Sequence, residues 1–295
     1  MTAPTDPGPR LDVRKTYKLY IGGAFPRSES GRTYEVTDAD GGFLANAARA
    51  SRKDVRDAVA AARKAQLGWA AATAYNRGQV LYRVAEILEG RREQFVAEVA
   101  ASEDGSRDDA GSTVDAAIDR WVWYAGWSDK FAQVSGAANP VAGPYFNLST
   151  PEPTGVVGAI APRSSSLLGL VEVVAPIIVS GNTVVVVASQ DRPLPATTLG
   201  EVLATSDVPG GVVNVLTGLT DELAPILAGH LDVNALDLAG LAGADTTDLE
   251  VLAAENVKRV RRPDPSEPDH RPTPAGPGRI LGFCETKTVW HPKGR

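Results

Sequence analysis

Residues 152–216 read EPTGVVGAIAPRSSSLLGLVEVVAPIIVSGNTVVVVASQDRPLPATTLGEVLATSDVPGGVVNVL. Three short runs in this stretch are rich in valine: residues 156–160, 183–187 and 212–215. The segments between them are expected to be helices, residues 167–179 and 195–205. Short Val-rich runs that alternate with helices indicate parallel strands buried on both faces and joined by crossover helices. The pattern therefore predicts an α/β fold built on a doubly wound, Rossmann-like parallel sheet with helices on both faces, and such sheets often bind a nucleotide beyond the carboxyl ends of their strands.

Composition narrows the class of protein. The chain has 295 residues, of which 43% are apolar, as expected for a globular protein. No apolar run approaches the roughly 18 residues of a membrane span, and the N-terminal MTAPTDPGPRLDVRK has no apolar core of a secretory signal. The net charge of −6 gives no basic footprint for nucleic acid, and the single cysteine, Cys284, excludes an internal disulfide. We therefore expect a cytoplasmic protein with no membrane or nucleic-acid partner.

Three phrases in the central stretch resemble the nucleotide-binding half of the NAD(P)-dependent aldehyde dehydrogenase superfamily. PTGVVGAIAPRSSSLL, GNTVVVVASQDRPL and VPGGVVNVLTG are similar to the family's PxGVVGxIxPWNFPLL, GNTVVxKPAExTPL and LPxGVVNVxTG. The similarity covers residues 17–260 and resumes in RILGFCETKTVWHPKGR, residues 279–295, which resembles the strand at the family's C-terminus. The resemblance implies an additional arm for oligomerisation, made of a β-hairpin and this C-terminal strand.

The resemblance also predicts how the chain is divided. Where family members continue into a second, catalytic domain, this chain has RRPDPSEPDHRPTPAGPG, and six prolines in this run favour an extended linker. The resemblance thus implies that the nucleophile-bearing domain is absent between the two matching parts. The expected parts are a disordered tail (residues 1–16), a nucleotide-binding-type domain (17–262), a proline-rich linker (263–278) and an arm strand (279–295). The hairpin of the arm, residues 139–150, belongs to the nucleotide-binding-type domain.

Four positions of the implied site come from the first two phrases. The family's PWNFP supplies an asparagine amide to the developing oxyanion, whereas this chain keeps Pro162 but has Ser164 in place of the asparagine. The family's KPAE places a lysine and a glutamate near the adenosine ribose. Here those positions are Val187, which cannot hydrogen-bond through its side chain, and Gln190.

The glycine motifs that approach the pyrophosphate in the family are also changed. The family's TGxGxxxG keeps Gly218 but has Thr220 and Ala224 at its later glycines, and GSTxxG keeps Gly240 but ends in Asp245. Asp245 would place an anion where a phosphate approaches. We therefore interpret Pro162, Ser164, Val187, Gln190, Gly218 and Gly240 as a vestigial cleft and expect no cofactor, with NAD(P) as the cofactor only if the site still works.

The remaining candidates for chemistry are weak. Cys284 is the sole thiol and lies in an alternating segment, so it is interpreted as a strand residue, because reactivity needs an electropositive site. The three histidines are far apart in sequence and suggest no metal site. Glu103 and Asp104 are expected in a solvated loop. The basic cluster at residues 258–262 is expected to face solvent, with contact to an anion or a partner as the alternative. Trp121, Trp123, Tyr124 and Trp127 are expected to pack in the core.

Two functions from different classes remain open. The first is a non-catalytic interaction protein, which assembles through its arm with a full-length aldehyde dehydrogenase subunit or with itself. The second is an NAD(P)-binding oxidoreductase that acts on aldehydes with a degenerate site. The substituted cleft favours the first, because chemistry is argued from the site and not from the fold.

Overall fold

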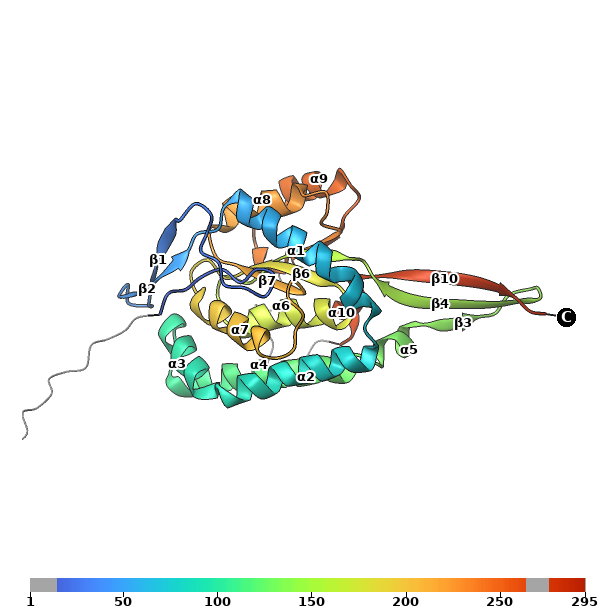
Figure 1. The fold of residues 1–295 in the computed structure, drawn as a ribbon, viewed down its shortest axis with the longest axis horizontal. Helices are drawn as coiled ribbons and strands as arrows, with labels where there is room; N and C mark the ends of the chain where they lie inside the picture. The colour runs from blue at the N-terminus through green and yellow to red at the C-terminus, as the bar shows by residue number, and fades with distance from the viewer. Residues whose placement is uncertain (1–14, 264–275, 295) are drawn as a thin grey trace, which may run out of the picture.

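A computed structural model describes residues 15–263 and 276–294 of the chain. The larger part of the expected N-terminal tail and of the proline-rich linker lies outside the described residues. The centre is a parallel sheet of five strands in the order β7-β6-β5-β8-β9 (Figure 1). These strands are Val213–Leu216, Thr183–Val187, Val156–Ile160, Ala235–Asp237 and Arg259–Arg261. The predicted doubly wound parallel sheet is confirmed.

The two central strands show why the valine-rich runs fold in this way. Every residue of β5 and of β6 is buried, so both faces of the sheet are covered by helices. β-branched side chains pack well on such a pleated surface, and a buried parallel strand needs apolar residues on both faces rather than alternation. The apolar residues of these strands therefore form a continuous run in the sequence and do not alternate with polar residues.

Helices form a layer on each face of the sheet (Figure 1). One apolar core joins the sheet to Ala74–Gly90 (α2), Arg92–Ser102 (α3), Arg107–Trp127 (α4), Leu168–Val179 (α6) and Leu194–Ala204 (α7). A second core joins the other face to Arg52–Ala71 (α1), Thr220–Gly229 (α8) and Thr247–Ala254 (α9). Trp121 and Tyr124 are fully buried, which confirms their predicted place in the core. No described helix is long and apolar enough to cross a membrane.

The N-terminal part lies along one end of the sheet. The strands Thr33–Thr37 (β1) and Phe43–Ala48 (β2) form an antiparallel pair, and Ser51 with Asp54 forms a capping box at the start of α1. Residues 17–25 form only part of a hairpin. Ile21 and Ala24 form one bridge around the turn, but Tyr20 pairs with Val215 of β7 instead of continuing a hairpin.

A separate three-stranded sheet projects from the body as an arm (Figure 1). Its order is β10-β4-β3, formed by Cys284–Pro292, Tyr145–Pro153 and Ala137–Asn139. The antiparallel β10–β4 register runs from Cys284 opposite Pro153 to Pro292 opposite Tyr145. The arm therefore extends beyond the predicted residues 139–150 at both ends, and its C-terminal strand pairs with the hairpin of its own chain.

The base of the arm is anchored in the core. The short helix Gly278–Leu281 (α10) and the residue before β10 bring Ile280 and Phe283 to full burial. Arg279 lies 3.4 Å from the buried Glu172, which also pairs with the buried Arg120. The C-terminal segment is thus a structural part of the domain and not an appendage.

Candidate functional site

The six residues of the predicted cleft come from four different strand ends at one edge of the sheet. Pro162 and Ser164 follow β5. Val187 is the last residue of β6, and Gln190 follows that strand. Gly218 follows β7 and Gly240 follows β8, so all six residues lie at the carboxyl ends of strands. Parallel strands bring their carboxyl ends to the same edge, which is where ligands bind in open α/β sheets. The topology therefore places these residues at one edge.

Gln190 is engaged with the protein itself. Its Oε1 accepts a hydrogen bond from the backbone N–H of Thr220 at 3.0 Å, at the first residue of α8. The first N–H groups of a helix have no partner within the helix, and together with the helix dipole they form a natural anion site. In this chain the Gln190 side chain occupies one of those donors.

The start of α9 is capped in a similar way. Asp245 Oδ1 accepts from the backbone N–H of Thr247 at 3.0 Å and from its hydroxyl at 2.6 Å. The hydrogen bond from the Thr247 hydroxyl, with that from its N–H, lowers the pKa of Asp245, so the exposed carboxylate remains charged at neutral pH. A negative charge at a helix N-terminus is stabilising. Asp245 thus places an anion at this helix end, in keeping with its residue type.

Val187 and the two glycines contribute to packing. Val187 is fully buried in the core between the sheet, α1 and α8. A Cβ on Gly240 would lie 2.3 Å from the carbonyl oxygen of Ala161, so only glycine permits this approach to the end of β5. Gly218 has a φ of +151°, a conformation that side chains disfavour, and its Cβ would lie 3.1 Å from the Ala50 nitrogen.

Charged side chains tie together the loops after β5 and β6. Arg163 binds Asp191 through two parallel hydrogen bonds of 2.9 Å. Arg192 donates to the carbonyl oxygen of Ser164 and lies 3.4 Å from Asp104. The exposed Ser164 therefore belongs to a loop fixed by its neighbours. The sequence analysis did not predict these contacts between the two loops. The only signal for them in the sequence was that charged residues follow the ends of two adjacent strands.

Two predictions about charged residues were right only in part: Asp104 is exposed in the loop between α3 and α4, and Arg259 and Arg262 are exposed. Glu103 is not simply solvated, because its Oε1 accepts from the backbone N–H of Ser166 and so holds the loop after β5. The basic cluster is only partly exposed: Lys258 is buried, and Arg261 pairs with the buried Asp237 at 3.1 Å. The sequence pattern could not show these partners, because they come from other strands and helices.

Comparison with known proteins agrees with this architecture. Residues 25–261 match the model of the "Aldehyde dehydrogenase family". The chain belongs to the aldehyde dehydrogenase family. It is 31% identical over 283 residues to a putative aldehyde dehydrogenase, DhaS, of Bacillus subtilis, with 92% of this chain and 56% of the relative covered. It is also 31% identical to human retinal dehydrogenase 2 over 261 residues, or 86% of this chain and 49% of that protein.

Solved structures of aldehyde dehydrogenases share the fold. An NAD+ complex of the aldehyde dehydrogenase from Bacillus cereus superposes with a TM-score of 0.79 at 26% identity, covering 83% of this chain and 50% of that one. A putative aldehyde dehydrogenase from Burkholderia cenocepacia gives 0.79 at 28% identity, over 84% and 50%. The chain thus spans about half the length of the relatives that it matches.

The position of the sole thiol bears on aldehyde dehydrogenase chemistry. Cys284 is 6% exposed, and its Sγ donates to the carbonyl oxygen of Ile280 at 3.4 Å. Burial raises the pKa of the thiol to about 11, so at neutral pH it is protonated. The neighbouring Phe283 carbonyl accepts from the N–H of Thr154 and from Asn182, which precede β5 and β6. Cys284 therefore lies near the amino ends of the parallel strands, whereas the residues of the predicted cleft lie at their carboxyl ends.

No metal cluster is found among the described residues. The Nδ1 of His230 accepts from the Asp232 N–H at 3.2 Å, His291 lies on the arm, and His270 falls outside the described residues.

Two cavities, of about 300 and 1060 Å³, are lined by other residues than the six cleft positions. The smaller cavity is described below.

Proposed function

We propose that this chain is a non-catalytic member of the aldehyde dehydrogenase family that binds a full-length family member through its arm and acts as a structural or regulatory subunit. The observation that carries the proposal is an uncovered apolar face on the arm. Phe146, Leu148 and Val289 are 47%, 36% and 49% exposed and lie on one side of the β4–β10 pair. We call these three residues the apolar arm face.

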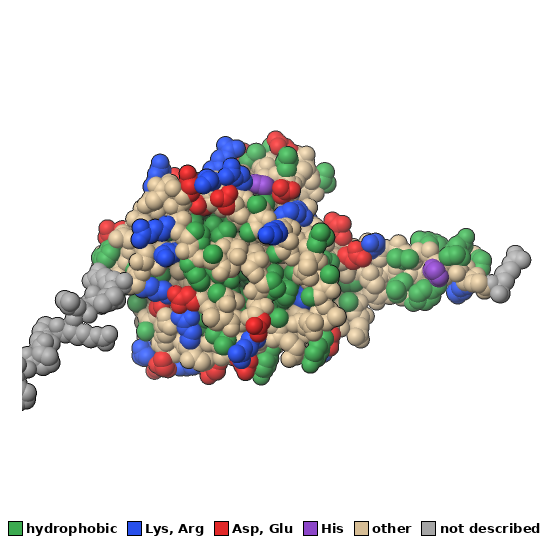
Figure 2. Space-filling model, in the orientation of Figure 1, with side chains coloured by type: hydrophobic (Ala, Val, Ile, Leu, Met, Phe, Trp, Pro, Cys, Tyr) green, Lys and Arg blue, Asp and Glu red, His purple; other side chains and the backbone are tan. Residues whose placement is uncertain are grey.

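The two sides of the arm differ in whether their side chains have hydrogen-bond partners within the arm. On the opposite side, Asn139 donates to Asn147 at 2.5 Å and to Ser149 at 2.8 Å, and Ser149 bonds Thr288 at 2.8 Å. That side therefore carries a polar ladder across all three strands, and beyond it, toward the tip, the exposed rings of Tyr145 and Trp290 contact each other with centroids 5.8 Å apart. The apolar arm face has no comparable internal partner layer, and Figure 2 shows hydrophobic side chains gathered along the arm, away from the body. Contiguous exposed apolar surface is typical of a protein interface.

The cleft supports the non-catalytic part of the proposal. The thiol is protonated, buried and on the opposite edge, whereas a cysteine nucleophile must be an accessible thiolate. Between β9 and α10 the chain has only residues 262–277, where the resemblance implies a catalytic domain. Side chains of this chain occupy or charge the helix ends that a dinucleotide phosphate would use.

The alternative is an NAD(P)-binding oxidoreductase that acts on aldehydes with a degenerate site. It is favoured by the similarity to an NAD+ complex and by the retained arrangement of four strand ends at one edge. Calorimetric titration with NAD+ and NADP+ decides between them on the cofactor. We expect no binding in the micromolar range and no aldehyde oxidation. Saturable micromolar binding, with turnover lost in Cys284→Ser, would establish the alternative.

The partner is tested with one substitution on each side of β10. Val289→Asp places a charge on the apolar arm face, and Thr286→Asp places the same charge on the other side of the same strand. We co-express each variant with a full-length aldehyde dehydrogenase of the same organism and isolate the complex by a tag on this chain. The proposal expects Val289→Asp to lose the partner at least tenfold and Thr286→Asp to keep it. Equal recovery of the partner by both variants, or none by the wild type, contradicts it.

These substitutions are preferable to deleting the C-terminal strand. Removing residues 279–295 would also remove Ile280 and Phe283, which are fully buried, and the Arg279–Glu172 ion pair. Such a chain would lose part of its core together with its arm. A size-exclusion profile of the wild type alone shows whether it self-associates through the same face, in which case Val289→Asp makes it monomeric.

A further inference from the structure

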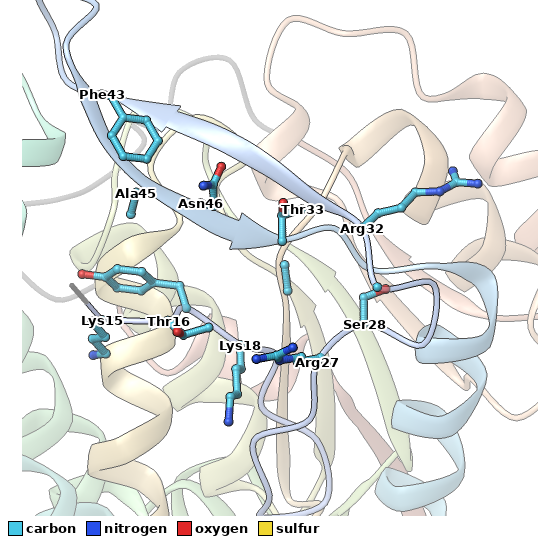
Figure 3. A pocket seen from close by; sticks show the side chains of 13 residues that line it. Lys15, Thr16, Lys18, Arg27, Ser28, Arg32, Thr33, Phe43, Ala45 and Asn46 are labelled. Carbon is cyan, nitrogen blue, oxygen red and sulfur yellow. The ribbon is translucent and has the colours of Figure 1, made fainter. Parts of the chain in front are cut away.

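We infer that a pocket at the opposite end of the molecule from the arm binds a small organic dianion, either a phosphate monoester or a short dicarboxylate. The pocket has a volume of about 300 Å³ and lies between residues 15–18, the loop at residues 27–33 and the strand β2 (Figure 3). Figure 1 shows β1 and β2 at one end of the body and the arm at the other. The pocket and the apolar arm face are therefore independent surfaces.

The charge of the lining is the first argument. Lys15, Lys18, Arg27 and Arg32 line the pocket, and none of the described residues that line it is an aspartate or a glutamate, although the whole chain carries a net charge of −6. Lys15 is already neutralised, because it lies 2.9 Å from Glu201 and donates to Thr198 at 2.7 Å. Lys18, Arg27 and Arg32 form no ion pair within residues 15–263 and 276–294. An anion bound in the pocket would supply the missing counter-charge.

The arrangement of these cations is the second argument. In Figure 3 the Arg27 guanidinium lies near the upper part of the Lys18 side chain, whose ammonium points downward, away from β2, and Arg32 points toward the other end of the pocket. An anion bound beside these residues would be attracted by positive charges that pair with no carboxylate of the described residues. Arginine offers a planar fork suited to phosphate or carboxylate, and lysine a point charge. The arginines and lysines of the lining therefore suit a ligand with anionic oxygens, such as a phosphate or a carboxylate.

The remaining lining fits an organic body attached to that anion. Thr16, Thr33 and Asn46 present polar groups, while Tyr17 and Phe43 add aromatic wall. Ser28 is not available, because its hydroxyl donates to Asp54 at 2.8 Å. The buried Asp54 carboxylate also accepts from the backbone N–H groups of Glu29 and Ser51. Its charge is engaged in capping α1 and does not compete for the pocket.

The size of the pocket limits the ligand. A volume of about 300 Å³ lies at the lower end of the range for small-molecule sites. A dinucleotide is too large, whereas the phosphate ester of a small alcohol or a dicarboxylate of a few carbons is of suitable size. Both have the same recognition chemistry, namely two negative charges on a small body.

The test titrates the full-length wild-type chain with inorganic phosphate and, separately, with succinate, by calorimetry at constant ionic strength. The test variant is Lys18→Gln/Arg27→Gln. The matched control is Lys64→Gln/Arg83→Gln, which removes the same charge from exposed positions of α1 and α2. We expect saturable binding of at least one probe, weakened at least tenfold in the test variant and within twofold of wild type in the control.

Further variants make the result specific. Arg27→Lys keeps the charge but loses the fork, so it should bind with an intermediate affinity, and it also serves if the double variant folds poorly. Val289→Asp should bind as the wild type does, which separates this site from the arm. Tighter binding of phosphate identifies a phosphate monoester, and tighter binding of succinate a dicarboxylate. Absence of saturable binding by both probes, or equal weakening in test and control variants, overturns the inference.

Discussion

The carboxyl ends of the sheet strands and the arm differ in whether their exposed side chains have partners within the chain. At the sheet edge, Gln190 caps α8, Asp245 caps α9, and Arg163 and Asp191 bind each other. On the arm, the apolar face of Phe146, Leu148 and Val289 remains exposed. Polar groups that bind one another within the chain have less to offer a ligand, whereas exposed apolar surface is stabilised only by a partner. This difference is the reason for proposing the arm, and not the sheet, as the surface that binds a partner.

The largest effect is expected where the arm joins the body. Phe283→Ala removes a fully buried ring at the base of β10, and we expect it to lower the free energy of unfolding by about 3–5 kcal/mol. Trp290→Ala, near the tip of the same strand and 57% exposed, should cost under about 1 kcal/mol. Urea denaturation of the two variants measures the contrast. Similar losses would mean that the arm is not divided into a buried base and a free surface.

A second effect concerns the thiol beside that base. Burial raises the pKa of Cys284 from an ordinary value of about 9 to about 11, so the folded chain favours the neutral thiol. The stability that this provides is present below pH 9 and is lost as the pH rises toward 11, by about 2–3 kcal/mol. Denaturation at several pH values between 8 and 11 should show this loss in the wild type and a smaller one in Cys284→Ala. Parallel pH profiles would mean that the thiol is not titrating there.

The fold could be predicted further than the site, for a physical reason. A buried parallel strand requires a local run of β-branched residues, so β5 and β6 are visible in the sequence itself. The engagement of Gln190 by Thr220, by contrast, joins residues 30 positions apart and depends on how two loops meet. The same holds for Glu103, predicted in a solvated loop but bonded to Ser166. Residue identity showed that the cleft had changed, but not what the new residues bind.

The third prediction tests whether the cap on α8 stabilises the sheet edge. Gln190→Ala leaves the Thr220 N–H without its acceptor, and we expect a loss of about 1 kcal/mol. Gln190→Glu is the matched control, because it keeps the acceptor and adds a negative charge at the helix N-terminus, so its stability should equal or slightly exceed that of the wild type. Thermal unfolding of both variants and of the wild type measures these differences in stability. If Gln190→Ala is as stable as the wild type, the side chain does not act as a cap.

The smallest expected effect is the Arg163–Asp191 pair, although its geometry is the best at this edge. Both hydrogen bonds are 2.9 Å long and run in parallel, which favours the pair. Both side chains are, however, about half exposed, at 59% and 47%, so water and salt screen the attraction. A double-mutant cycle of Arg163→Ala and Asp191→Ala should give a coupling of about 0.2–1 kcal/mol, and 1 M salt should reduce it. Coupling well above that range, and insensitive to salt, would mean that the two loops shield the pair from solvent. The sheet edge would then be a rigid, closed structure rather than a screened surface, and the contrast with the arm would be stronger than proposed.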